Sequence, residues 1–190
     1  KTHLIVHQSL TLSGSAESYA NYHIDTHGWA GIAYHFVIEK DGTIKWCNDL
    51  GVVSYHAGNA NIYSVGVSLT GDFRTQNPTD AQYESFYKLI AVLKKELNIT
   101  DNKRIIGHQE APTYIWKQCP GLDMDALRGH IASGKNGKVR NNFNNDTKIL
   151  IDVPHSTETI VHEPGKVYWK DMELRKGQKG IITIIKPINL

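Results

Sequence analysis

The chain has 190 residues, 40% of them apolar and 21% charged, which is ordinary for a globular protein with one core or one domain plus a small appendage. The formal net charge of +2 is too small to indicate nucleic-acid binding, although a mildly basic protein tolerates an anionic polymer. No apolar run approaches the length of a membrane-spanning helix, so we expect no membrane insertion.

The first part of the chain predicts four strands and one helix. Residues 1–7 alternate between two faces, as in a strand, and residues 13–26 carry small and apolar side chains at helical spacing. Residues 33–39 and 43–47 predict two strands joined by an Asp-Gly turn, which is the signal of a hairpin. Residues 65–69 form a nearly continuous apolar run, which is typical of a central strand.

The clearest helix is predicted over residues 80–97. Thr79 and Gln82 have the spacing of a capping box at its start. Residues 104–106 predict a short strand, and residues 122–132 predict a last helix. Because strands and helices alternate along the chain, we predict that the main domain is α/β.

The composition changes near Ser133. Residues 134–147 are polar and rich in Asn and Gly, which predicts a linker or extended loop. Residues 148–190 contain several strand-like runs, but so short a segment rarely folds alone. We therefore predict a main domain over residues 1–133 and a small β-rich C-terminal segment of unknown role, which either packs on that domain or begins a further one.

The chain contains two cysteines, Cys47 and Cys119. Their number permits one disulfide, but a chain of this length does not need one, and we expect none. Cys47 lies in a strand-like run and is interpreted as a small buried hydrophobic residue. We interpret Cys119 as a metal ligand and not as a disulfide partner.

One short loop, residues 107–121, combines His108, Lys117 and Cys119. Histidine and cysteine thiolate are zinc ligands, and a metal site needs such groups close together on a rigid turn. Lys117 precedes Cys119 by two residues, so in an extended stretch both side chains point to the same side. A catalytic zinc site also needs a third protein ligand and an open position for water.

Three other places could meet this loop. They are His7 at the end of the first predicted strand, the Tyr-His-Phe run that contains His35, and the Tyr-His-Ala-Gly run that contains His56. The end of a strand in an α/β sheet is a common place for a functional side chain, which favours His7. His35 is predicted to point to the face opposite Tyr34, and we interpret it as a structural residue.

Five motifs follow one another in a fixed order: a strand ending in Val-His, Gly-Trp-x-x-Ile-x-Tyr-His-Phe, His-Ala-Gly-Asn, Ser-Val-Gly-Val-Ser-Leu-Thr-Gly-Asp-Phe, and Gly-His followed by Lys-x-Cys-Pro-Gly. In this order they resemble the zinc-dependent N-acetylmuramoyl-L-alanine amidases, which include the amidase lysozymes of T-odd phages and the peptidoglycan recognition proteins. The resemblance covers about residues 1–132. It implies a central mixed β-sheet flanked by helices, with a zinc-containing groove.

The resemblance also implies one zinc ion per chain, held by His7, His108 and Cys119 with water in the fourth position. It implies a catalytic Tyr34 and, by likeness to the phage enzymes, a catalytic Lys117. A hydroxyl or an ammonium group beside the metal would stabilise the oxyanion that forms during amide hydrolysis. The stretch from His108 to Cys119 is a few residues longer than in the phage enzymes, so we expect a larger excursion of the chain there.

Other residues near the predicted centre leave alternatives open. His56 either lines the substrate groove or orders a loop, without a direct bond to zinc. Trp29 and Trp116 either form a groove wall that stacks on sugar or peptide, or simply pack against neighbours. Glu110 is interpreted as a solvated carboxylate, the alternative being an acceptor for a ligand histidine. Five further histidines are interpreted as structural or surface residues: His23, His27, His130, His155 and His162.

The function that the resemblance implies is hydrolysis of the amide between N-acetylmuramic acid and L-alanine in peptidoglycan, by a monomeric endolysin or autolysin. Such an enzyme acts on the bacterial cell wall; no signal peptide is visible, which fits cytoplasmic synthesis from a phage gene and later release. Peptidoglycan is the expected partner, and nucleic acid is not. Two alternatives stay open: a non-catalytic peptidoglycan-binding module of the same fold, and the amidase domain of a phage tail or virion protein.

Overall fold

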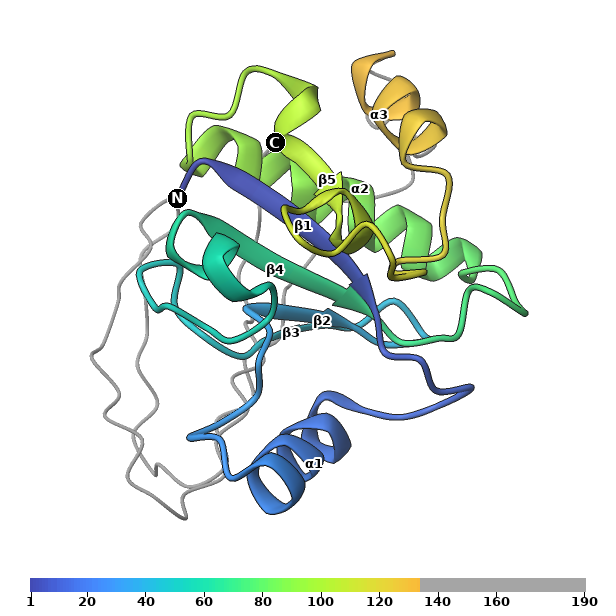
Figure 1. Ribbon diagram of the computed structural model, residues 1–190. Coiled ribbons are helices and arrows are strands. Elements are labelled where there is room, and N and C mark those ends of the chain that lie inside the picture. The colour runs from blue at the N-terminus through green and yellow to red at the C-terminus, as the bar shows by residue number, and fades with distance from the viewer. Residues whose placement is uncertain (134–190) are drawn as a thin grey trace, which may run out of the picture.

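A mixed five-stranded sheet forms the centre of the protein, with strand order β3-β2-β4-β1-β5 (Figure 1). The computed structural model describes residues 1–133; the predicted linker and C-terminal segment lie outside the described residues. Strands β1, β2, β4 and β5 run parallel to one another, and only β3 runs antiparallel, against β2. The strands are β1 (His3–Gln8), β2 (Phe36–Ile38), β3 (Ile44–Trp46), β4 (Ser64–Leu69) and β5 (Ile105–Gly107).

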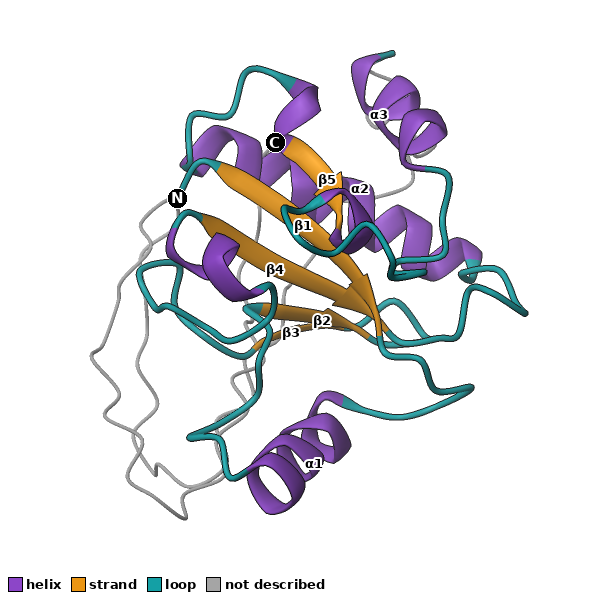
Figure 2. Cartoon of the chain, in the orientation of Figure 1, coloured by secondary structure: helices purple, strands orange, loops and turns teal. Residues whose placement is uncertain are grey.

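Three α-helices cover the sheet: α1 (Ala16–His27), α2 (Asp80–Glu96) and α3 (Met124–Ala132) (Figure 2). The predicted capping box of α2 is confirmed, because the Thr79 hydroxyl accepts from the amide of Gln82 and the Gln82 side chain accepts from the amide of Thr79, both at 3.1 Å. Within the described residues, no helix is both long enough and apolar enough to cross a membrane.

The main core lies between one face of the sheet and helices α2 and α3, with α2 running behind the sheet in Figure 1. Leu4 and Val6 of β1 point into it, together with Phe86 and Ile90 of α2. Fully burying one such aliphatic or aromatic side chain stabilises the fold by about 1.5–3 kcal/mol. The intervening residue of β1, Ile5, packs on the opposite face, so the alternation predicted for this strand is confirmed.

Helix α1 covers part of the opposite face of the sheet, where Ala16, Tyr19 and Ala20 pack against Val37 of β2. Cys47 belongs to the same cluster and is 5% exposed. Both cysteines are free, which confirms that the chain forms no disulfide between them.

The predicted strand over residues 33–39 is longer than the strand that forms, because β2 begins only at Phe36. Side chains from elsewhere bind the carbonyl groups just before it: the Asn48 amide donates to the Ile32 and Tyr34 oxygens, and Ser54 donates to the Ala33 oxygen. These bonds replace strand pairing and hold Tyr34 in a loop. Three short 3-10 helices were not predicted: η1 (Gly58–Ile62), η2 (Asn102–Arg104) and η3 (His108–Glu110).

Candidate metal centre

Three predicted ligands converge at one edge of the sheet. His7 lies near the end of β1, and His108 follows the end of β5 directly. Because these two strands are parallel neighbours, their ends meet, and the two imidazole rings lie 4.5 Å apart between centroids. Cys119 comes from the following loop, with its Sγ 3.8 Å from Nδ1 of His7. One ligand atom from each of the three buried residues lies within 4.8 Å of the others, so the group could hold a metal ion.

Hydrogen bonds from Gln8 fasten the Cys119 loop to β1. The Gln8 backbone amide donates to Sγ of Cys119 at 3.5 Å, and its side-chain amide donates to the Gln118 oxygen at 2.6 Å. On the other side, the Gln109 amide donates to the Cys119 oxygen at 2.7 Å. The thiol is therefore positioned from both elements that carry the histidines.

Glu110 fixes the turn that carries His108. One oxygen of its carboxylate accepts from the Gly107 amide at 2.6 Å, and both oxygens accept from Arg128 of α3 at 2.9 Å. Glu110 is exposed, as predicted for a solvated carboxylate, but it is also paired, and these bonds tie it to β5 and α3. The pairing joins residues 18 positions apart, and sequence spacing does not reveal it.

Burial keeps the two imidazoles neutral. It lowers the pKa of His7 well below its usual value, with further lowering by His56 and His108. Burial, followed by the charge of Lys117, lowers the pKa of His108 to about 4. The pKa of the Cys119 thiol shifts in the opposite direction, because burial raises it to about 11. At neutral pH the free site therefore holds two uncharged imidazoles and a protonated thiol.

One nitrogen of the site has no partner. Nε2 of His108 is buried and makes no hydrogen bond with any of residues 1–133. Buried polar atoms in folded proteins nearly always have a partner, so such a nitrogen requires an explanation. A metal ion bound by His108 beside a second imidazole and a thiol would supply one.

Tyr34 and Lys117 lie beside this group. The Tyr34 ring is 5.2 Å from the ring of His7 between centroids. Burial, followed by the charge of Cys119, raises the pKa of the Tyr34 hydroxyl, which stays protonated at neutral pH. The ammonium group of Lys117 lies 5.2 Å from the ring centroid of Tyr114 and 5.1 Å from that of Trp116.

A single cleft of about 650 Å³ contains the site. All eight residues singled out in the sequence line it: His7, Trp29, Tyr34, His56, His108, Trp116, Lys117 and Cys119. The structure adds lining residues that were not predicted to belong to the site: Gln8, Leu10, His23, Ala33, Tyr55, Gly58, Asn61, Arg74, Tyr114 and Gln118. Of these, Gln8 and Gln118 are direct sequence neighbours of His7 and Cys119, which is the only signal that could have indicated them.

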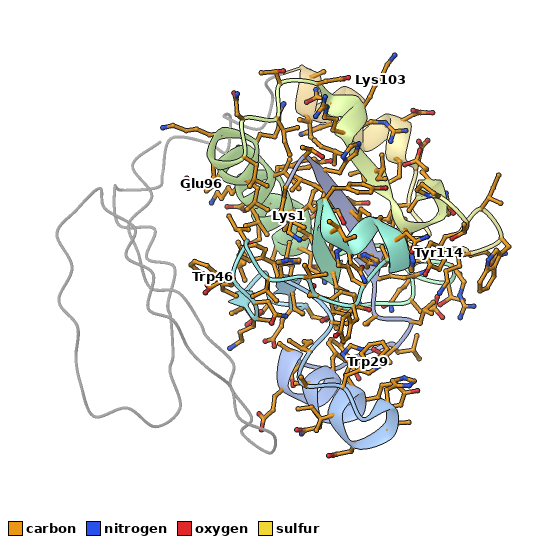
Figure 3. All side chains as sticks on the ribbon, turned by 60° about the vertical axis from the view of Figure 1, so that its left-hand side comes forward. Lys1, Trp29, Trp46, Glu96, Lys103 and Tyr114 are labelled. Carbon is orange, nitrogen blue, oxygen red and sulfur yellow. The ribbon has the colours of Figure 1, made fainter. Side chains whose placement is uncertain are left out.

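Aromatic side chains from separate parts of the chain line the cleft. Trp29 lies beside α1 in Figure 3, stacked on His27 with 4.9 Å between centroids. Tyr114, also labelled there, packs on the ring of His108 at 4.5 Å. Trp116 is 73% exposed at the rim. His23 was interpreted as a structural or surface residue; it accepts a hydrogen bond from the Ala33 amide at 3.1 Å and also lines the cleft.

The stretch after His108 folds back over the site. Two turns close it, with the Tyr114 amide donating to the Ala111 oxygen at 3.1 Å and the Lys117 amide to the Tyr114 oxygen at 2.8 Å. Ile115, at the tip, is 89% exposed. This stretch therefore places Tyr114 against His108 while bringing Lys117 back to the cleft.

His35 and His56 differ in their surroundings. His35 is fully buried, accepts from the Gly66 amide at 3.0 Å and lies 3.1 Å from the Val52 oxygen, as expected of a structural histidine. His56 lines the cleft, and its Nδ1 lies 3.0 Å from Nε2 of His7.

Residues 2–122 match the family model described as N-acetylmuramoyl-L-alanine amidase. The chain belongs to this amidase family. The family resemblance identified from the five motifs is therefore confirmed, and the match spans all of the residues that line the cleft, from His7 to Cys119.

Curated relatives of this amidase-family chain come from insects and phages. Peptidoglycan-recognition protein SC2 of Drosophila melanogaster is 31% identical over 103 residues, which cover 54% of this chain and 54% of that protein. The endolysin of Klebsiella phage KP32 is 34% identical over 102 residues, which cover 51% of this chain and 64% of that protein. The chain thus spans between half and two thirds of the length of these relatives.

Solved structures of the amidase family share the fold. The endolysin N-acetylmuramoyl-L-alanine amidase LysCS from Clostridium intestinale superposes with a TM-score of 0.62 at 26% identity, covering 69% of this chain and 83% of that one. The recognition protein PGRP-SA of Apis mellifera gives a TM-score of 0.56 at 24% identity, covering 63% and 75%, and shows the fold alone. The predicted fold, a mixed sheet flanked by helices, is confirmed.

Proposed function

We propose that this protein hydrolyses the amide between the lactyl group of N-acetylmuramic acid and the L-alanine of the peptidoglycan stem peptide, using one zinc ion. The observation that carries the proposal is the convergence of His7, His108 and Cys119 within 4.8 Å, inside the cleft of a chain that belongs to the amidase family.

The donor set fits zinc. One thiolate and two neutral imidazoles are ligands that zinc prefers, and three protein ligands leave a fourth tetrahedral position open. The unpartnered Nε2 of His108 and the neutral state of both histidines agree with this assignment. When bound, zinc would polarise the scissile carbonyl and lower the pKa of a bound water to near neutrality.

Tyr34 and Lys117 are proposed to stabilise the negative charge that develops on the carbonyl oxygen. The Tyr34 hydroxyl keeps its proton at neutral pH because its pKa is raised, so it can donate a hydrogen bond to an oxyanion. Lys117 adds a positive charge to the lining of the same cleft. Either group can also pass a proton to the leaving amine of L-alanine.

The walls of the cleft suit a substrate that combines sugar and peptide. Trp29 and Trp116 present aromatic surface on the lining, and we propose that they stack on sugar rings or peptide groups. Tyr114 and His23 extend these walls. Trp116 is exposed to solvent, so a polymer can reach this part of the lining.

The setting that we propose is an endolysin or autolysin that works as a monomer on the bacterial wall. The Lys-x-Cys pattern at Lys117 and Cys119 favours the phage type, in keeping with the 34% identity to a phage endolysin. The alternative proposal is that this chain is the amidase domain of a phage tail or virion protein. It depends on residues beyond the described part of the chain.

The direct experiment is digestion of purified peptidoglycan by the zinc-loaded protein, followed by mass spectrometry of the soluble products. We expect free stem peptides with an N-terminal L-alanine, and loss of these products after a chelator removes the metal. Products cut between sugars, or within the stem peptide, would contradict the proposed bond.

A second candidate function is peptidoglycan binding without cleavage. The 31% identity to a peptidoglycan-recognition protein favours it. Co-sedimentation with insoluble peptidoglycan, measured together with release of stem peptides, separates the two functions. Tight binding without any released peptide by zinc-loaded protein would support the binding module.

A further inference from the structure

His56 is a buried histidine beside the metal centre that is not part of the three-residue ligand group. It is 6% exposed, and its Nδ1 lies 3.0 Å from Nε2 of His7. The two rings meet edge to face with 5.1 Å between centroids. Because Nε2 of His7 is engaged by His56, the other nitrogen of His7, Nδ1, is the one that faces Cys119.

Ser64 sets the direction of the hydrogen bonds around His56. A serine hydroxyl has one proton, and that of Ser64 is donated to the Ala60 oxygen at 2.6 Å. A carbonyl oxygen can only accept, so this assignment has no alternative. The Ser64 oxygen must therefore accept from Nε2 of His56, which lies 3.3 Å away. This places the proton of His56 on Nε2.

The tautomer of His7 follows from that of His56. A neutral imidazole with its proton on Nε2 has a lone pair on Nδ1, so Nδ1 of His56 accepts from Nε2 of His7. The neutral ring of His7 then has its own lone pair on Nδ1, which lies 3.8 Å from Sγ of Cys119. The hydrogen bonds thus run in one direction from His7 through His56 and Ser64 to Ala60.

The backbone around His56 holds its ring in place. A Cβ atom on Gly66 of β4 would lie 2.7 Å from Cγ of His56, so only glycine lets the ring lie this close to the strand. The next residue, Ala57, donates its amide to the Asn61 side chain at 2.6 Å. Packing against β4 and anchoring to η1 therefore restrict the ring to one orientation.

We propose that His56 and Ser64 are positioning residues that fix His7 as the tautomer protonated on Nε2, so that its Nδ1 lone pair is presented to the metal. This inference rests on the proposed function, because it assigns Nδ1 of His7 as the zinc-binding atom. Neither His56 nor Ser64 binds the metal. Such partners orient a ligand and typically change metal affinity about 10–100-fold when they are removed.

Nitrogen NMR of the 190-residue chain labelled with ¹⁵N-histidine tests the tautomer directly, in both the metal-free and the zinc-loaded protein. We expect His7 and His56 to be protonated on Nε2 and unprotonated on Nδ1 at neutral pH. A proton on Nδ1 of His7 in the metal-free protein would overturn the proposal. This readout does not depend on activity.

Zinc affinity, measured by competition with a chelator, tests the consequence. His56→Phe removes the acceptor for His7, and we expect zinc binding to weaken about 10–100-fold. His56→Asn keeps an acceptor oxygen close to the position of Nδ1, so we expect it to recover most of the lost affinity. Equal affinity of His56→Phe and the unchanged protein would overturn the proposal.

A matched pair of serine variants separates the effect of the hydrogen bonds from His7 through His56 to Ser64 from the effect of general packing. Ser64→Ala removes the acceptor for His56. We expect it to weaken zinc binding and to let His7 populate both neutral tautomers. Ser54→Ala is the control, because the Ser54 hydroxyl is also buried, donates to a carbonyl at 2.8 Å and neighbours a histidine, His35. We expect it to leave zinc affinity and the His7 tautomer unchanged. Equal effects of both variants would contradict the positioning role of His56 and Ser64.

The outcomes distinguish this inference from the proposed function. If the unchanged protein binds no zinc, the proposed metal centre fails, and the NMR measurement still decides the tautomer of His7. If it binds one zinc per chain and cleaves peptidoglycan while His7 carries its proton on Nδ1, only the positioning role of His56 and Ser64 fails.

Discussion

Val6 and Gly107 are register partners in the parallel strands β1 and β5, so the residues that follow them, His7 and His108, lie side by side at the same edge of the sheet. The sheet thus places two of the three candidate ligands side by side before any loop is considered. Cys119 completes it, because Gln8, the residue after His7, holds the cysteine loop through its backbone amide and its side chain.

Zinc binding is expected to release one proton, which comes from Cys119. The pKa of its thiol is raised to about 11, whereas that of His108 is lowered to about 4 and that of His7 also lies well below its usual value. Near pH 6 the histidines are therefore already neutral and only the thiol must lose a proton, so zinc affinity should rise about tenfold per pH unit there.

Calorimetry near pH 6, in buffers with different ionisation enthalpies, measures this proton count. At this pH a zinc-bound water keeps its proton, since its pKa is about 7. Release of two or more protons would show that a histidine is charged in the free site. Release of none would remove Cys119 as a protonated ligand.

Lys117→Ala is expected to keep zinc and to lower kcat. If its ammonium group stabilises the oxyanion, its loss should reduce kcat on the order of a hundred- to a thousand-fold. Lys103→Ala is the control, because Lys103 is exposed on η2, away from the cleft. An unchanged kcat in a zinc-loaded Lys117→Ala protein would remove Lys117 from the mechanism.

Tyr34→Phe removes the hydroxyl and keeps the ring that lies 5.2 Å from His7. We expect stoichiometric zinc, a KM close to that of the unchanged protein, and a kcat lower by about a hundredfold because one donor to the oxyanion is lost. Tyr22→Phe, on the exposed side of α1, serves as the control. Loss of zinc in Tyr34→Phe would instead indicate that the hydroxyl supports the site.

Much of the fold and the ligand set could be predicted from the sequence. Period-two and helical spacing depend on local sequence, so the strands β1 and β4 and the helix α2 were predicted within a few residues. The ligands could be assigned because the family motifs occur in order. The family itself is confirmed, whereas the roles of the ligands, Tyr34 and Lys117 stay predictions.

The remaining features depend on contacts between distant parts of the chain. Tyr34 lies in a loop because Asn48 binds its carbonyl oxygen, and Glu110 is paired because α3 brings Arg128 to it. The contact between His7 and His56 joins residues 49 positions apart. No periodicity or spacing contains such information, since it arises only when the elements pack.

Acid is expected to destabilise the metal-free protein through His35. Burial lowers its pKa to about 4 from the usual value of 6.5, and Nδ1 accepts from the Gly66 amide, a bond that protonation would break. Between these two pKa values the unfolded chain binds more protons than the folded one. The free energy of unfolding should therefore fall as the pH drops from about 6.5 to about 4, with no contribution from His35 above this window.

Urea unfolding of the metal-free protein across this pH range measures the effect. His35→Asn keeps an acceptor for the Gly66 amide and removes the titrating group, so we expect lower stability with a shallower dependence on pH. The exposed His27→Gln is the control and should keep the original slope. An identical slope in His35→Asn would exclude His35 as the source.

The most direct test of the central claim is mass spectrometry of peptidoglycan digested by zinc-loaded protein, compared between the unchanged chain, Cys119→Ser and Cys47→Ala. Cys47 is the matched control, since it is equally buried but packs under α1 outside the cleft. We predict stem peptides with a free N-terminal L-alanine from the unchanged chain and Cys47→Ala, and neither bound zinc nor released peptide with Cys119→Ser. Full zinc and full peptide release by Cys119→Ser would contradict the account.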